Sequence, residues 1–163
     1  MTDVTVIILV GREAIHIGRC LERLRPLEPR QIFVVESQPS DGTHEIAVKL
    51  GASTAFNKWP GNQARQFNWA LDNLPIKTQW AIRLDADEYL SEGLVDEIKA
   101  FVAKPQDDIS LVEIPFGRMW RSKRIRFGMP TVFVPRLFRF GRCRYGEMEM
   151  DERLTADSGR TIR

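Results

Sequence analysis

The chain has 163 residues, a length typical of a single domain. Hydrophobic residues make up 43% of it and charged residues 28%, which allows a packed core and excludes wholesale disorder. No apolar run approaches the roughly 18 residues of a membrane-spanning helix, and no signal-peptide pattern is visible, so we expect a cytoplasmic protein.

Charge is unevenly distributed along the chain. Residues 1–111 hold 12 basic and 16 acidic side chains, a net charge of −4. Residues 112–163 hold 12 basic and 6 acidic side chains, a net charge of +6. This asymmetry predicts an anionic partner for the C-terminal third.

Predicted strands and helices alternate over the first two thirds of the chain. Short apolar runs rich in β-branched residues predict buried strands over residues 4–10, 31–37 and 78–85. Apolar side chains at helical spacing predict helices over residues 13–26, 39–51 and 61–74, and a fourth that Ser91 caps and that continues through Val102. This alternation favours an α/β fold with a mostly parallel sheet.

Polar side chains follow three of the predicted strands directly. Glu13 comes shortly after the first strand, Glu36 closes the second, and Asp85 and Asp87 close the third. In open parallel sheets, ligands bind outside the carboxyl ends of the strands. We therefore expect these three strand ends to lie along one edge of the sheet and to form one site.

The pattern changes after residue 104. The segments DISLVEIPF and TVFVPRLFRF predict two strands with no clear helix between them, which indicates antiparallel β-structure. The chain then stops at SGRTIR without an evident final helix. We expect that a C-terminal part of the protein is missing.

The third strand runs into an acidic cluster, in the stretch WAIRLDADEYL. Asp85 and Asp87 are separated by one residue, so at a strand end they can share one divalent cation or divide metal and sugar contacts between them. Hard cations such as Mg²⁺ bind through one or two carboxylates together with substrate phosphates. Glu88 is expected to cap or orient the helix that follows.

Four segments, in order, resemble family 2 nucleotide-sugar glycosyltransferases of the GT-A fold. LDADE resembles the Asp-x-Asp motif of the family, VVESQPSDGTHEIAVKLGA its second strand, turn and helix, and QFNWAL its Q-x-N-x-A-L helix. PRLFRFGRCRYG and MDERL resemble later segments of a bacterial branch that modifies lipopolysaccharide cores and other surface glycans. The chain departs from the family at Gly11–Arg12 in the first motif, at Glu36 in place of aspartate, and at Asp151 in place of histidine.

The resemblance implies one GT-A domain over residues 1–163. Its mostly parallel sheet is flanked by helices, with a smaller antiparallel β part at the C-terminal end. Residues 1–104 would bind the nucleotide sugar, and residues 105–163 would face the acceptor. The implied reaction is a metal-dependent, inverting transfer of a sugar to a glycan or lipid-linked acceptor.

The resemblance also implies individual roles. Asp87 binds Mg²⁺ or Mn²⁺, Asp85 contacts the metal or the ribose, and Glu152 is the general base, with Asp151 as its alternative. The positive partner of the acidic cluster is then expected to be a cation carrying a diphosphate, not a protein side chain. The other expected donor-binding residues are Glu13, Glu36, Asp41, Arg65, Gln66, Asn68 and Arg136.

A basic and aromatic stretch, GRMWRSKRIRFG, separates the last two predicted strands. It could bind an anionic acceptor or the inner face of the plasma membrane, or it could be the solvated face of a hairpin. No nucleic-acid-binding motif accompanies it, so we expect no nucleic acid partner. The membrane contacts are expected at Arg118, Arg121, Lys123, Arg124 and Arg126.

Two other functions stay open. A nucleotidyltransferase also uses paired carboxylates, but the segment GREAIHIG is a poor match to the Gly-rich phosphate loop of that class. The altered first motif is compatible with a degenerate, non-catalytic module that binds nucleotide sugars.

Overall fold

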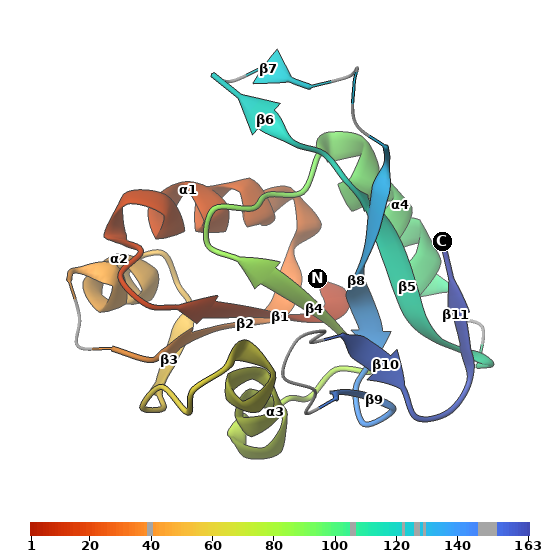
Figure 1. The fold of residues 1–163 in the computed structure, drawn as a ribbon, viewed down its shortest axis with the longest axis horizontal. Helices are drawn as coiled ribbons and strands as arrows, with labels where there is room; N and C mark the ends of the chain where they lie inside the picture. The colour runs from red at the N-terminus through yellow and green to blue at the C-terminus, as the bar shows by residue number, and fades with distance from the viewer. Residues whose placement is uncertain (39–40, 105–106, 122, 126–127, 129, 147–152) are drawn as a thin grey trace.

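A computed structural model describes residues 1–38, 41–104, 107–121, 123–125, 128, 130–146 and 153–163 (Figure 1). Within these residues, seven strands form one sheet in the order β11-β5-β8-β4-β1-β2-β3. Four neighbouring strands are parallel to one another and end at the edge strand β3: they are β1 (Thr2–Val10), β2 (Pro29–Glu36), β3 (Ser53–Phe56) and β4 (Trp80–Asp85).

The remaining strands all follow residue 104. Strand β8 (Val132–Arg139) lies between β4 and β5 (Ile109–Phe116) and runs antiparallel to both. Two small antiparallel pairs are added, and β11 pairs in parallel with β5. The bounds of these strands are β6 (Met119–Trp120), β7 (Lys123–Arg124), β9 (Cys143–Tyr145), β10 (Leu154–Ala156) and β11 (Arg160–Ile162).

Four α-helices cover the two faces of the sheet. Helices α1, α2 and α4 lie on one face, with a short 3₁₀ helix, η1 (Arg25–Leu27), following α1, while α3 lies on the other face (Figure 1). Successive residues of a strand point to opposite faces, so Val6 and Ile8 pack under α1 and α4, and Ile7 packs under α3. The bounds of the helices are α1 (Ala14–Leu24), α2 (Thr43–Lys49), α3 (Gln63–Asn73) and α4 (Glu92–Ala103).

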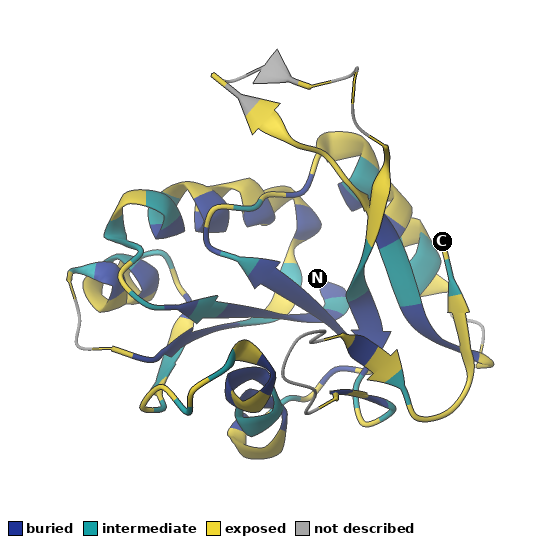
Figure 2. Cartoon of the chain, viewed as in Figure 1, coloured by how far each residue is buried: buried dark blue, intermediate teal, exposed yellow. Residues whose placement is uncertain are grey.

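Burial follows this layering. Strands β1 and β4 are almost entirely buried, as continuous apolar runs in a sheet covered on both faces must be (Figure 2). Trp80, Phe67 and Phe138 are among the largest fully buried side chains. No helix in the described part of the chain is long and apolar enough to cross a membrane.

The predicted α/β fold is confirmed, and so are the three predicted strands and four predicted helices. Ser91 caps α4 as predicted, since its hydroxyl accepts a hydrogen bond from the backbone N–H of Leu94 at 3.4 Å. The antiparallel part is joined to the parallel sheet through β8, so both halves share one sheet. Strand β3 was not predicted, because four half-exposed residues carry little pattern. The division of the domain at residue 104 stays a prediction.

Candidate functional site

The carboxyl ends of three parallel strands meet at one edge of the sheet. Leu9 on β1 pairs with Asp85 on β4, and Val10 pairs with Glu36 on β2, so the three strand ends are adjacent, as predicted. A cleft of about 420 Å³ opens beyond them. Its walls are formed by Leu9, Val10, Gly11, Glu13, Ser37, Gln38, Trp59, Gln63, Gln66, Asp85, Ala86 and Asp87.

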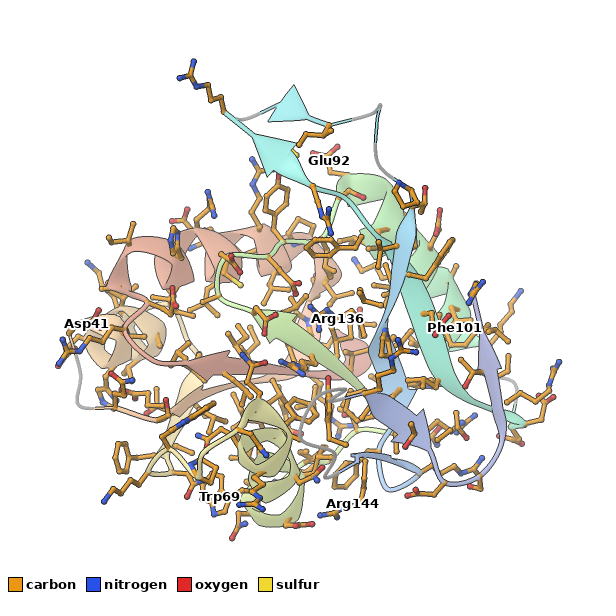
Figure 3. All side chains as sticks on the ribbon, viewed as in Figure 1. Asp41, Trp69, Glu92, Phe101, Arg136 and Arg144 are labelled. Atoms are coloured by element: carbon orange, nitrogen blue, oxygen red, sulfur yellow. The ribbon has the colours of Figure 1, made fainter. Side chains whose placement is uncertain are left out.

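Two arginines hold the carboxylate of Asp85. Arg83 donates to one oxygen at 3.4 Å, and Arg136 donates to the other at 3.2 Å. Arg136 lies on β8 beside the end of β4 (Figure 3) and is also paired with Glu88. The expectation that no protein side chain neutralises the acidic cluster was therefore wrong for Asp85 and Glu88. Guanidinium groups suit this position because they present several donors in a planar fork.

Asp87 is the acidic residue of the cluster that keeps an available carboxylate. Its side chain is exposed, and it makes no hydrogen bond or ion pair with the residues that the structure describes. Only its backbone oxygen is used, as an acceptor from Arg19 at 3.4 Å. Beside the Asp85 carboxylate, which two cations already engage, the cleft thus presents the free carboxylate of Asp87.

These donors fit a cation that a ligand helps to bind. Among the described residues, no group of three His, Cys, Asp or Glu side chains is arranged to hold a metal ion. Mg²⁺ and Mn²⁺ do not need such a cage, since one or two carboxylates, phosphate oxygens and waters complete their coordination. Asp87 would supply the carboxylate, and a bound diphosphate would supply the other charged oxygens.

Comparison with known proteins decides the family. The sequence model of glycosyl transferase family 2 matches residues 5–148. The chain belongs to glycosyl transferase family 2. A relative from Rickettsia felis, named only as an uncharacterized glycosyltransferase, is 30% identical over 144 residues, which cover 88% of this chain and 47% of the relative. The chain thus spans about half the length of the curated relatives that it matches.

Solved structures agree with the family on the fold. The mannosyltransferase PcManGT from Pyrobaculum calidifontis, in complex with GDP-Man and Mn²⁺, aligns with a TM-score of 0.55 and 19% identity over 68% of this chain and 34% of that protein. A glucosyl-3-phosphoglycerate synthase from Mycobacterium tuberculosis, in complex with Mn²⁺, UDP and glucosyl-3-phosphoglycerate, aligns with a TM-score of 0.52 and 15% identity over 68% of this chain and 42% of that protein. The predicted GT-A fold is confirmed.

Arg83 is a component of this family 2 site that sequence reasoning missed. Its side chain is 7% exposed, lies over the rings of Phe67 and Tyr145, and donates to Gln63 at 2.5 Å and to the Tyr145 hydroxyl. Burial acts against its charge, but the neighbouring Tyr145 and Asp85 outweigh burial and raise the pKa of Arg83. The available signal was a lone cation inside the apolar run WAIRLD.

Three further cleft residues were also missed. Gln63 lies one helical turn before Gln66 on α3, so the two amides face the same side. Trp59 is 44% exposed and lies in the turn after β3, where it presents an aromatic wall. Ser37 continues β2 into the cleft, and its hydroxyl donates to the backbone oxygen of Val10 at 3.0 Å.

Glu36 is close to the cleft but is not part of its wall. It is 6% exposed, and its carboxylate lies 2.9 Å from Nδ1 of His44 on α2. His44 is thus an immediate neighbour of Glu36, one of the predicted donor-binding residues. A base that approaches Glu36 would have to share this carboxylate with the imidazole.

Asp41 holds the turn behind the cleft together. Its carboxylate accepts from the hydroxyl of Thr43 at 2.5 Å and from the backbone N–H of Thr43 at 3.2 Å. The Thr43 hydroxyl in turn accepts from the backbone N–H of Glu13 at 3.0 Å. Hydrogen bonding by Thr43 lowers the pKa of Asp41. These contacts tie the loop after β1 to the start of α2 and thereby position Glu13.

The remaining predicted residues are not brought into the cleft. The side-chain amide of Asn68 exchanges two hydrogen bonds with the backbone of Tyr145, at 2.9 and 3.0 Å, and so anchors β9 to α3. Arg65 is exposed on α3, outside the cleft wall. Asp151 and Glu152 lie outside the described residues. The roles predicted for these four residues stay predictions.

Glu88 does not cap α4, which was one of the two roles expected of it, because Ser91 occupies the cap position. Its carboxylate instead turns back, accepts from the backbone N–H of Asp85 at 3.1 Å, and pairs with Arg136. Burial raises the pKa of Glu88, with a further contribution from Asp85, while Arg136 opposes the change. The folded protein therefore binds the Glu88 proton more tightly than the unfolded chain does.

This raised pKa predicts how stability changes with pH. As the pH falls from about 7 towards the ordinary value of 4.5, the wild type should gain stability relative to Glu88→Gln. The gain is lost again as the pH rises through the raised pKa. Urea unfolding of both proteins at several pH values measures the difference. A difference that is constant, or that grows in the opposite direction, would contradict this assignment.

Proposed function

We propose that this chain is the donor-binding part of an enzyme that transfers a sugar from a nucleotide sugar to a glycan or lipid-linked acceptor. The observation that carries the proposal is the free carboxylate of Asp87, in a cleft at the ends of β4, β1 and β2. Family membership and the Mn²⁺ and nucleotides named for the two similar structures support it.

The leaving group of such a transfer is a nucleoside diphosphate, which gains negative charge as the glycosidic bond breaks. A divalent cation at Asp87 would neutralise that charge. Arg83 and Arg136 keep Asp85 in one orientation, so its oxygens present a fixed surface to the ribose or the metal. Gln63 offers its amide nitrogen as a donor, because only its oxygen is engaged, by Arg83, and Trp59 offers a ring face for a base or sugar.

An inverting transfer also needs a general base that takes the proton of the acceptor hydroxyl. We assign this role to Glu152, with Asp151 as its alternative. The described residues next to them support the assignment, because Gly146 donates to the backbone oxygen of Arg153 at 3.3 Å. Tyr145, adjacent to Gly146, contacts Arg83, which pairs with Asp85. The two residues that flank the segment are thus bonded to each other, and the neighbouring Tyr145 is linked to Asp85 through Arg83.

One observation favours a second candidate function. The engagement of both Asp85 oxygens by arginines is also compatible with a module that binds nucleotide sugars without turnover. Binding and turnover therefore have to be measured separately.

Nucleotide binding is expected to depend on the cation. With Mn²⁺ present, a matching nucleoside diphosphate at about 100 times its dissociation constant should stabilise the fold by roughly 2.7 kcal/mol, which raises the melting temperature by roughly 5–10 °C. Without Mn²⁺ the shift should nearly vanish. Thermal melting with GDP, UDP, ADP and CDP checks this. If no nucleotide shifts the melting temperature, the proposal fails; if one does but no nucleotide sugar is consumed, the binding module is favoured.

A further inference from the structure

Strands β5 and β8 continue beyond the sheet as a two-stranded projection. Strand β4 pairs with β8 only at residues 137–139, whereas β5 stays paired with β8 as far as Phe116 and Val132. Strands β6 and β7 extend this pair outward, away from the helices (Figure 1). We call residues 116–133 the projecting ribbon and use only the side chains that the structure describes.

Exposed apolar side chains are concentrated on the projecting ribbon. Of the 11 large hydrophobic side chains that are prominently exposed in the described chain, five lie in these 18 positions (Figure 2). They are Phe116 (38% exposed), Met119 (46%), Ile125 (41%), Val132 (40%) and Phe133 (36%). Single exposed apolar residues need no explanation, but such a concentration marks an interaction surface.

The same ribbon is strongly basic. Residues 117–133 contain five Lys or Arg residues and no Asp or Glu. Of these, Arg118 and Arg121 are described as exposed and lie immediately on either side of β6. Cations and apolar side chains are therefore interleaved along the projecting ribbon, and its own sequence contains no acidic residue.

This combination distinguishes between classes of partner. Nucleic acid binding uses cations and base-stacking rings and does not need exposed Met, Ile and Val side chains. Protein interfaces share the enrichment in Phe, Met and Arg but are depleted of Lys, which the ribbon contains at Lys123. An anionic bilayer can bind both the basic and the exposed apolar side chains of the ribbon. Its phosphates attract arginine, and its interfacial region accepts apolar side chains.

We propose that the projecting ribbon docks on an anionic lipid bilayer. Met119, Ile125 and their apolar neighbours enter the interfacial region, and Arg118 and Arg121 pair with lipid phosphates. The base of the ribbon is fixed to the cleft, because Arg136, three residues after Phe133, contacts Asp85 and Glu88. Docking would therefore hold the cleft at the membrane surface, where a lipid-linked acceptor resides. The role of a lipid-linked acceptor rests on the proposed function, whereas docking of the ribbon does not.

Co-sedimentation with lipid vesicles tests the proposal. The wild type should sediment with vesicles of phosphatidylcholine and phosphatidylglycerol and remain largely in solution with phosphatidylcholine alone. The variants Met119→Ser/Ile125→Ser and Arg118→Gln/Arg121→Gln should each lower partitioning at least about tenfold, since apolar insertion and charge act together. Both change exposed residues, so melting temperature and the nucleotide-induced shift should stay unchanged.

A matched control removes two apolar side chains elsewhere. Val48→Ser/Phe56→Ser changes residues that are 52% and 60% exposed on α2 and β3, at the other edge of the sheet, and should bind vesicles like the wild type. Wild-type protein that ignores anionic vesicles would overturn the proposal. So would unchanged vesicle binding by Met119→Ser/Ile125→Ser. If only Arg118→Gln/Arg121→Gln loses affinity for vesicles, and it loses affinity for duplex DNA to the same extent, the ribbon is a nucleic acid surface instead.

Discussion

Replacing Asp87 by asparagine is expected to abolish sugar transfer while the fold survives. The substitution keeps the shape of the side chain but removes the only free carboxylate of the acidic cluster, and with it the anchor of the cation. Loss of charge stabilisation at a leaving group costs roughly a factor of 10³ in kcat or more. The loss of turnover is measured as the rate at which nucleoside diphosphate is released from the nucleotide sugar in the presence of Mn²⁺.

Stability provides the necessary contrast. Asp87 is exposed and unpaired among the described residues, so the variant should unfold within about 0.5 kcal/mol of the wild type. Asp96→Asn, the same neutralisation of an exposed aspartate on α4, should keep wild-type turnover and the Mn²⁺-dependent nucleotide shift. Turnover by Asp87→Asn at the wild-type rate would refute the metal assignment.

The position of the candidate site could be predicted because it depends on local patterns. Each buried strand is recognisable from its apolar run, and the carboxyl ends of parallel strands must meet at one edge. That reasoning placed Asp85 beside the ends of β1 and β2, and the register Leu9–Asp85 and Val10–Glu36 agrees. No contact between distant segments was needed for this step.

The partners of the acidic residues could not be predicted in the same way. Arg136 reaches Asp85 because β8, 51 residues later in the chain, inserts between β4 and β5. Nothing local in the sequence specifies that insertion. Asn68 illustrates the same limit: the sequence placed it in a helix, but did not show that its amide bonds to the backbone of Tyr145.

The largest expected effect on stability comes from Arg83. Replacing it by methionine keeps much of the volume but leaves the Tyr145 hydroxyl, the Gln63 amide and one oxygen of Asp85 without their donor. Removing one member of a buried polar cluster leaves its partners desolvated and unpaired, at a cost of about 3 kcal/mol here. A chain of this size should then melt roughly 6–12 °C lower, which calorimetry measures.

The cost should not be larger, for two reasons. First, the Asp85 side chain is 37% exposed, so water can replace the donor that it loses. Second, Nε of Arg83 is buried without a hydrogen-bond partner among the described residues, so the wild type already bears the desolvation cost of that atom. Arg144→Met gives the matched comparison: it breaks an exposed pair with Asp72, worth less than about 1 kcal/mol. If Arg83→Met is no more destabilising than Arg144→Met, the cost of burying the Arg83 charge cancels its contacts. Arg83 would then act by orienting Asp85, so Arg83→Met should lower turnover without lowering the melting temperature.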